Sequence, residues 1–152
     1  MITFQPTVDL LTSAQITFDN MRSYYEHYLV DWDLSTIRQQ IETLENWDIL
    51  YNNIVVGAIR IEYDNQGCYL RDLQVDTKFQ NKGIGAAALI KAEHLASNKG
   101  LSQLRLRVFK ISPAHQLYKR VGFMLDKEDD RFYYMSKNTL TRNGNRTTKP
   151  EA

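Results

Sequence analysis

The stretch FQNKGIGAAALIKAEHLA, residues 79–96, places Gly83 and Gly85 where a polar loop becomes a helix with periodic apolar residues. Glycine is a poor helix former, so a glycine pair at a helix entrance needs a physical reason. Either the backbone takes a conformation that only glycine tolerates, or another molecule approaches it more closely than a side chain would allow. The second reason would make this entrance an anion-binding site, because the first amides of a helix lack intrahelical partners.

The sequence around this stretch predicts a strand–helix–strand unit. Residues 68–75 and 104–109 are rich in apolar side chains and predict strands. Between them, residues 83–98 carry apolar side chains at helical spacing, and Gly100 follows at the position typical of a helix C-terminus. The two strands of such a crossover run parallel and connect right-handedly.

Two helices are predicted before this unit. The first covers about residues 12–29 and is capped by Thr12 or Ser13. The second begins at Ser35, again as the cap, and ends near Leu44. The apolar positions that recur at near-helical spacing in the first helix are Ile16, Met21, Tyr24 and Tyr28.

The predicted sheet is antiparallel before the crossover. A short first strand covers residues 2–8, with Pro6 marking an edge or an end. Strands at residues 49–51 and 54–61 then lead into the strand at 68–75 as a meander. Its hairpin turns are expected at Asn52-Asn53 and at residues 64–67.

The remaining sequence predicts a fourth helix and two closing strands. Ser112 and Pro113 open the helix, Gly122 ends it, and two strands flank an acidic turn within residues 123–138. The fold class is therefore α/β, a mixed sheet with four helices in which an antiparallel meander precedes one parallel pair. We expect a single domain at residues 1–138 and a polar, flexible tail at 139–152.

Charge is segregated along the chain although the formal net charge is only +1. Residues 1–70 carry three Lys/Arg and ten Asp/Glu, whereas residues 71–120 carry ten and three. Two interpretations remain open. The charges belong to an ordinary solvated surface, or they form a basic pole for an anionic ligand and an acidic pole for a cationic partner.

Several classes of protein are disfavoured by composition. The single cysteine, Cys68, cannot form an internal disulfide and fits a small core residue in a cytoplasmic protein better than a nucleophile. The three histidines are far apart and lack ligand spacing, so no metal site is expected. No membrane span and no nucleic-acid-binding module are predicted either.

Two nucleotide-binding motifs, the P-loop and the dinucleotide-binding motif, do not fit the sequence around the glycine pair. No Lys-Ser or Lys-Thr follows a second glycine, as a P-loop requires. Residues 83–88 match G-x-G-x-x-A literally, but a seven-residue loop, residues 76–82, separates the strand from Gly83. The next strand also lacks the acidic residue that a dinucleotide ribose needs.

The combination of elements resembles the GNAT superfamily of acetyl-CoA-dependent N-acetyltransferases. LRDLQVDTKFQNKGIGAAAL (residues 70–89) looks like that family's strand, loop and pyrophosphate-binding turn, and residues 80–85 fill its (Gln/Arg)-x-x-Gly-x-(Gly/Ala) pattern. LRLRVFKISPAHQLYKRVGF (residues 104–123) is similar to the strand and helix that follow. The order of elements agrees over nearly the whole chain before the tail.

The resemblance implies a binding site for acetyl-CoA and a splayed parallel strand pair. In that family the pantetheine arm bonds to free backbone groups between the splayed strands, here at Leu73 and Val75, and the pyrophosphate binds the amides of the following turn. The residues of that turn are Gln80, Asn81, Lys82, Gly83, Ile84, Gly85 and Ala86. Lysines proposed as further phosphate contacts are Lys78, Lys82, Lys110 and Lys119.

The resemblance also implies a catalytic acid. Tyr118 matches the tyrosine that protonates the leaving thiolate, although a buried core tyrosine is the alternative. The chain departs from the family at two positions. Arg71 stands where many members have a glutamate base, and Ile111 stands where many have an asparagine. Arginine cannot accept a proton, so the base is open, with Asp72 a weak candidate.

The acceptor is expected to dock against the N-terminal helices and the meander. Residues 24–28 and 31–33 combine aromatic rings and carboxylates, which suit a cationic amine, although such a helix could simply bury its aromatic residues. The implied function is acetyl transfer to a primary amine of a small molecule or peptide. A non-catalytic acetyl-CoA sensor is the alternative, and a homodimer is expected from the resemblance.

Overall fold

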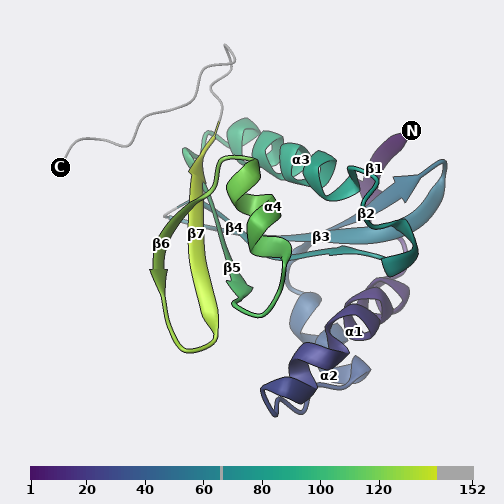
Figure 1. Cartoon of the computed structure of the whole chain (residues 1–152). Coiled ribbons are helices and arrows are strands. Elements are labelled where there is room, and N and C mark those ends of the chain that lie inside the picture. Colours follow the sequence, from purple (N-terminus) through teal and green to yellow (C-terminus); the bar gives the residue numbers. More distant parts are fainter. Residues whose placement is uncertain (66, 140–152) are drawn as a thin grey trace. The chain divides into compact units, whose positions relative to one another are not determined.

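The computed structural model describes residues 1–65 and 67–139. In these residues, seven strands form one mixed sheet in the order β1-β2-β3-β4-β5-β7-β6, accompanied by four α-helices (Figure 1). The predicted mixed sheet with four helices is therefore confirmed. In chain order the elements are β1 (Ile2–Pro6), α1 (Leu10–His27), α2 (Leu34–Ile41), β2 (Glu45–Tyr51), β3 (Ile54–Asp64), β4 (Gly67–Val75), the short 3-10 helix η1 (Thr77–Phe79), α3 (Ile84–Asn98), β5 (Gln103–Phe109), α4 (Ala114–Arg120), β6 (Met124–Glu128) and β7 (Phe132–Asn138).

The chain divides into two compact units. The first unit contains Met1–Ile61 and Asp72–Ala88, and the second contains Glu62–Arg71 and the chain from Leu89 onward. The elements β3, β4 and α3 contribute residues to both units.

The first unit contains the predicted antiparallel hairpin. β1 pairs with β2, and β2 pairs with β3, both antiparallel. Asn52 and Asn53 form the turn between β2 and β3 with φ values of 49° and 69°. A two-residue hairpin turn of this hand needs positive φ at both positions, which asparagine tolerates. A Cβ at Gly57 would collide with the carbonyl oxygen of Gln74, so glycine is required there on β3.

The helix caps differ from the prediction. α1 is capped by Asp9, whose Oδ1 accepts hydrogen bonds from Leu11 and Thr12 amides at 3.1 and 3.2 Å. α2 is capped by Asp33, which accepts from the Thr36 amide at 2.8 Å. The backbone hydrogen bonds from Thr12 and Thr36 lower the pKa values of the two carboxyl groups. The assignments of the caps to Thr12 or Ser13 and to Ser35 were therefore wrong, because a carboxylate precedes each serine or threonine.

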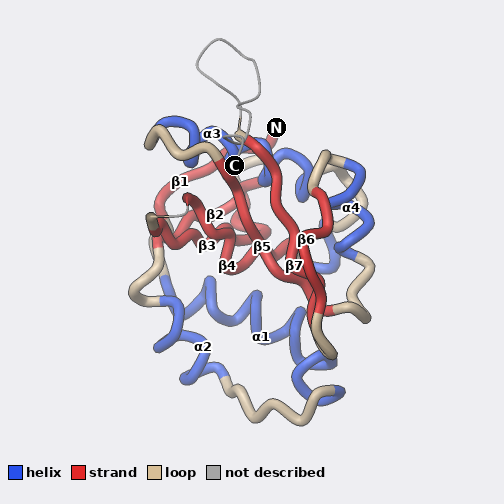
Figure 2. The backbone as a smooth tube through the Cα atoms, turned by 90° about the vertical axis from the view of Figure 1, so that its left-hand side faces the viewer, coloured by secondary structure: helices blue, strands red, loops and turns tan. Residues whose placement is uncertain are grey.

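The buried face of α1 is partly polar. α1 and α2 lie side by side (Figure 2), and the buried residues of α1 are Ser13, Ala14, Thr17 and Tyr25. The apolar positions whose spacing predicted the helix, Ile16, Met21, Tyr24 and Tyr28, are only half-buried. The hydroxyl groups of Ser13 and Thr17 are buried because they are hydrogen-bonded to the buried guanidinium of Arg60.

The second unit contains the predicted parallel pair. β4 pairs with β5 in parallel from Cys68↔Leu104 through Leu70↔Leu106, while the strands themselves extend to Val75 and Phe109. β5 pairs antiparallel with β7, and β7 with β6, which is exposed along its whole length (Figure 1). Leu104, Leu106 and Met135 are buried in this unit.

The second unit also holds a buried ion pair and the end of the described chain. Lys137 Nζ on β7 lies 2.9 Å from Glu93 Oε2 on α3, with side chains only 10% and 5% exposed.

Thr139 is buried and donates hydrogen bonds to the carbonyls of Leu101 and Ser102. The rest of the predicted tail, residues 140–152, lies outside the described residues.

No helix among the described residues is long and apolar enough to cross a membrane. Within the same part of the chain, no group of three or more His, Cys, Asp or Glu side chains is placed to hold a metal ion.

Candidate functional site

The loop between β4 and α3 is built from short local contacts in the first unit. The Asp76 carboxylate accepts a hydrogen bond from the Lys78 amide at 3.0 Å, and the Phe79 amide donates to the Asp76 carbonyl at 2.8 Å. Asn81 and Gly83 then adopt positive φ values of 62° and 79°. These two residues reverse the chain and direct it into α3.

The reason for Gly83 is conformational. Its φ of 79° lies in the left-handed region that glycine adopts without strain. A Cβ built at Gly83 would meet no atom within 4 Å, so crowding within the chain does not require glycine. The space beside the helix entrance is open, and residues 80–83 are exposed to solvent.

The first amides of α3 are available to an anion. The first intrahelical bond runs from the Ala87 amide to the Gly83 carbonyl at 3.1 Å. Within residues 1–65 and 67–139, no side chain caps the amides of Ile84, Gly85 or Ala86. These amides and the helix dipole form a donor set that suits a phosphate group, and the exposed Lys82 adds a cation. The residues present therefore fit a diphosphate.

Two side-chain amides donate hydrogen bonds to the carbonyl of Val75, the last residue of β4. Asn20 Nδ2 donates to this oxygen at 2.8 Å and Gln80 Nε2 donates at 2.9 Å. The amide of the same peptide, that of Asp76, donates to the Val56 carbonyl at 2.7 Å. The Val75–Asp76 peptide, which joins β4 to the loop, therefore has hydrogen-bond partners at both its carbonyl and its amide group.

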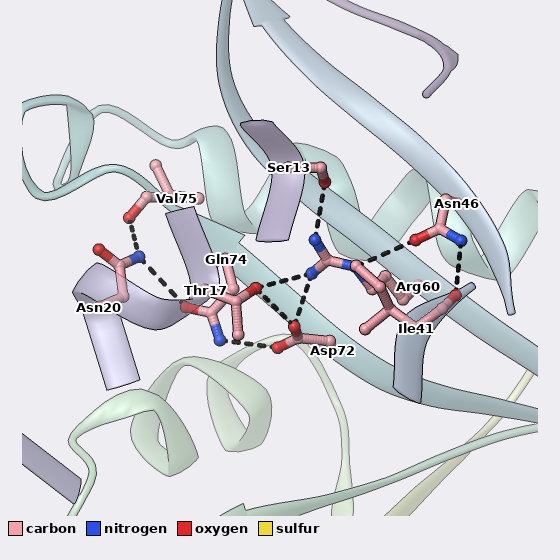
Figure 3. A network of polar contacts seen from close by, with 9 residues as sticks. All are labelled: Ser13, Thr17, Asn20, Ile41, Asn46, Arg60, Asp72, Gln74 and Val75. Atoms are coloured by element: carbon pink, nitrogen blue, oxygen red, sulfur yellow. Dashed lines mark hydrogen bonds and ion pairs between the residues drawn. The ribbon is translucent and has the colours of Figure 1, made fainter. Parts of the chain in front are cut away.

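A fully buried arginine organises the polar contacts beside this strand (Figure 3). Arg60 is 0% exposed, and its Nη1 lies 2.6 Å from Asp72 Oδ2. Its other hydrogen bonds go to Thr17 Oγ1 at 2.7 Å, Ser13 Oγ at 2.7 Å and Asn46 Oδ1 at 3.0 Å. Asn46 in turn donates to the carbonyls of Ile41 and Leu44. The guanidinium therefore connects α1, α2, β2 and β4.

Asp72 has a structural partner on each oxygen. Its Oδ2 accepts from Arg60 and from the Thr17 hydroxyl at 2.8 Å, and its Oδ1 accepts from Gln74 Nε2 at 2.7 Å. A buried guanidinium needs such a counter-charge. If Asp72 acted as a base, it would have to give up this pairing.

Tyr118, the predicted catalytic acid, lies in the second unit on α4. It is only 8% exposed, and its ring meets Phe123 edge-on at a centroid distance of 5.7 Å. α4 begins at Ala114, whose amide donates to Ser112 Oγ at 3.2 Å. The predicted helix from Ser112 to Gly122 is confirmed to within about one residue at its start, and Gly122 follows it with a φ of 104°.

Arg71 is exposed and paired in the second unit. Its Nη1 lies 3.0 Å from Glu62 Oε2, and its guanidinium lies over the ring of Tyr69 at 5.3 Å. Ile111, the other departure from the family pattern, is 47% exposed. Among the lysines proposed as phosphate contacts, Lys110 pairs with Glu128 at 2.8 Å, and the hydrogen bond that its ammonium group donates to this carboxylate raises the Lys110 pKa. Lys78, Lys82 and Lys119 are exposed.

The family of the chain follows from comparison with known proteins. The family model described as "Acetyltransferase (GNAT) family" matches residues 10–123. The chain belongs to this family. The predicted fold and the acyltransferase class are thereby confirmed.

Relatives of this acetyltransferase are distant in sequence. It is 24% identical over 126 residues to a spermidine N(1)-acetyltransferase of Thermoplasma acidophilum, covering 75% of this chain and 78% of the relative. It is 23% identical over 128 residues to YxbD, an uncharacterized protein of Bacillus subtilis, covering 79% and 77%.

Solved structures show the same fold. The PaiA N-acetyltransferase of Thermoplasma acidophilum, in complex with coenzyme A, superimposes with a TM-score of 0.70 at 18% identity, covering 91% of this chain and 99% of that one. The ribosomal-protein-S18-alanine N-acetyltransferase of Escherichia coli gives a TM-score of 0.68 at 19% identity, covering 91% and 94%.

Sequence reasoning missed Arg60 and its partners in this acetyltransferase. The available signal was a single charged residue inside the apolar run IVVGAIRI, residues 54–61. Strand alternation places Arg60 on the same face as Val56 and Ala58, both fully buried. A buried arginine at such a position requires carboxylate and hydroxyl partners. Two of them, Ser13 and Asp72, had been considered only as a helix cap and as a base.

We predict that Asp72→Asn lowers the free energy of unfolding by about 3–5 kcal/mol, because it leaves the Arg60 guanidinium buried without a counter-charge. Urea unfolding of the purified variant measures the change. Glu62→Gln is the matched control, since it removes an ion pair whose side chains are 46% and 49% exposed, and it should change stability by about 1 kcal/mol or less. Equal losses in the two variants would contradict the structural role of the buried pair.

Proposed function

We propose that this acetyltransferase transfers an acetyl group from acetyl-CoA to a primary amine of a small molecule or peptide. The single observation that carries the proposal is the set of uncapped amides at Ile84, Gly85 and Ala86 beside an exposed lysine. Membership of the GNAT family supports the acetyl donor. The coenzyme A bound to the PaiA relative is consistent with it.

The proposed binding residues form one continuous segment of the first unit. Leu73 would hold the pantetheine arm through its backbone groups and Val75 through its amide, because the Val75 carbonyl already accepts two hydrogen bonds. Residues 80–86 would hold the diphosphate. Ile84 supports this proposal because it is 1% exposed and anchors the start of α3, while residues 80–83 stay exposed. The donors are thus fixed by a buried side chain and open to solvent on the other side.

The proposed reaction is direct attack of the amine on the thioester within a ternary complex. The new bond joins the amine nitrogen to the acetyl carbon, the carbon–sulfur bond breaks, the nitrogen loses a proton and the thiolate gains one. Tyr118 is the proposed donor of the proton to sulfur. The group that accepts the proton from nitrogen is unassigned in this proposal, because arginine occupies the family's glutamate position.

The proposed acceptor is a cationic amine of polyamine-like or lysine-like chemistry. The spermidine acetyltransferase activity of a relative supports this class. In the first unit, Asp31 is exposed beside Trp32, which is 36% exposed and meets Tyr25 at 5.4 Å. Of the other polar groups in this region, Asp33 already caps α2. The Tyr25 phenol is buried, which raises its pKa. Asp31 and Trp32 are therefore the proposed cation contacts.

A non-catalytic acetyl-CoA sensor is the second candidate. Arg71 favours it, since this residue replaces the expected base and is already paired with Glu62. A cytoplasmic location remains a prediction from the sequence, and a homodimer remains a prediction from the family resemblance.

We predict that Ala86→Glu weakens acetyl-CoA binding at least about tenfold, because it places a carboxylate among the amides proposed to hold the diphosphate. The same change should leave the fold intact, since acidic residues are favourable in the first turn of a helix. Calorimetric titration and thermal unfolding measure the two effects. Ser35→Glu is the matched control, because it adds the same charge to the exposed first turn of α2. Unchanged affinity in Ala86→Glu would contradict the proposed site.

We predict that Tyr118→Phe retains acetyl-CoA binding but loses about a hundredfold or more in kcat, as expected when a general acid is removed. The alkaline limb of the wild-type pH–rate profile should disappear in this variant. Tyr69→Phe, which removes a hydroxyl from a half-buried tyrosine of the same unit, should retain activity. Near wild-type turnover with an unchanged alkaline limb in Tyr118→Phe would contradict the assignment.

We predict thiol release from acetyl-CoA with a panel of amines, fastest with acceptors that carry two or more cationic groups. An enzyme releases free thiol in proportion to amine consumed. A sensor would be stabilised against heat by acetyl-CoA without releasing thiol. A preference for neutral or acidic acceptors would contradict the proposed role of Asp31 and Trp32.

A further inference from the structure

A polar stripe runs along α1 within the first unit. Ser13, Thr17 and Asn20 are spaced by four and three residues, so their side chains share one face of the helix. Ser13 and Thr17 bind the buried Arg60. Asn20 lies one turn further on and contacts the end of β4 instead (Figure 3).

Asn20 is the last link in a chain of hydrogen bonds that begins at Arg60. Arg60 binds Asp72, Asp72 accepts from Gln74 Nε2, and Gln74 Oε1 accepts from Asn20 Nδ2 at 3.1 Å. The second hydrogen of the Asn20 amide goes to the Val75 carbonyl at 2.8 Å. Because Gln74 is 8% exposed, this part of the chain is shielded from water.

The two donors to the Val75 carbonyl are not equivalent. Gln80 is exposed, and its side-chain amide makes one hydrogen bond, to Val75. Asn20 is half-buried and makes two hydrogen bonds, one to a side chain that is itself held by Asp72. The orientation of the Val75–Asp76 peptide is therefore set mainly by Asn20 on its carbonyl side and by the Val56 carbonyl on its amide side.

We infer that Asn20 is a positioning residue for cofactor binding. It fixes the Val75–Asp76 peptide, so that the end of β4 and the first residues of the loop at 76–82 are held in one orientation before the ligand arrives. This inference rests on the proposed function, in which β4 and the following loop take the acetyl donor. Preorganisation of this kind favours binding because the ordering of the backbone is complete before association.

Asn20→Ala tests the inference, with Gln15→Ala as the matched control on the same helix. Gln15 is exposed, and its side-chain amide donates to Asp19 at 2.8 Å. Calorimetry with coenzyme A and acetyl-CoA should show about tenfold weaker binding in Asn20→Ala, the factor that corresponds to one lost hydrogen bond, and unchanged binding in Gln15→Ala. Asn20→Asp should bind more weakly still, since a carboxylate cannot donate to the Val75 carbonyl or to Gln74.

Amide hydrogen exchange supplies a readout that is independent of ligand and activity. In Asn20→Ala the Asp76 amide should exchange faster, whereas the Ala87 amide in the first turn of α3 should be unaffected. In steady-state kinetics the KM for acetyl-CoA should rise while kcat at saturation changes little. Wild-type affinity and wild-type Asp76 exchange in Asn20→Ala would overturn the positioning role. Failure of the wild-type chain to bind acetyl-CoA would overturn the proposed function instead.

Discussion

The first unit depends on the compensation of one buried charge. Arg60 has no access to water, and an uncompensated guanidinium at such a place would destabilise the fold by several kcal/mol. Its partners come from α1, β2 and β4, so the charge can be buried only when these elements are already assembled. The hydrogen bonds and the ion pair of Arg60 therefore fix the position of α1 against β4, the strand that precedes the loop at residues 76–83. The same contacts explain why α1 carries a stripe of polar side chains.

The loop between β4 and α3, residues 76–83, depends on a different kind of constraint. Its shape comes from residues that tolerate positive φ, Asn81 and Gly83, and from the buried Ile84 that anchors α3. Nothing in the described chain fills the space beside Gly83. The turn into α3 is thus defined by these backbone conformations, and the side of Gly83 where a Cβ would stand has no neighbouring atom within 4 Å, an arrangement that suits an anion held by main-chain amides. The positive φ of Gly83 explains the first glycine of the pair. The same turn brings the first amides of α3 to the surface beside it.

The sequence predicted the order of elements, the Asn52-Asn53 turn, the parallel crossover and the glycine that ends α4, because each depends on local residue types or on a short period. It failed where the decisive partner is distant in the chain. Apolar spacing predicted that α1 is a helix but did not reveal its buried face, because hydrogen bonds from Arg60, 43 and 47 residues away, bury Thr17 and Ser13. The capping residues were predicted wrongly for a simpler reason. Asp9 and Asp33 lie just before the predicted caps, and a carboxylate competes well with a hydroxyl group for the first amides of a helix.

The acidic N-terminal region and the arginine at the base position together constrain the chemistry of the proposed acceptor. A carboxylate beside an ammonium group stabilises the charged form, whereas attack on a thioester needs a neutral nitrogen. A carboxylate such as Asp31 would therefore slow the reaction if it held the reacting amine itself. It would assist the reaction if it held a second cationic group of the same molecule. An acceptor with two amines resolves the conflict, because one stays charged and bound while the other loses its proton and attacks. This argument favours a polyamine-like acceptor over a simple monoamine on chemical grounds alone.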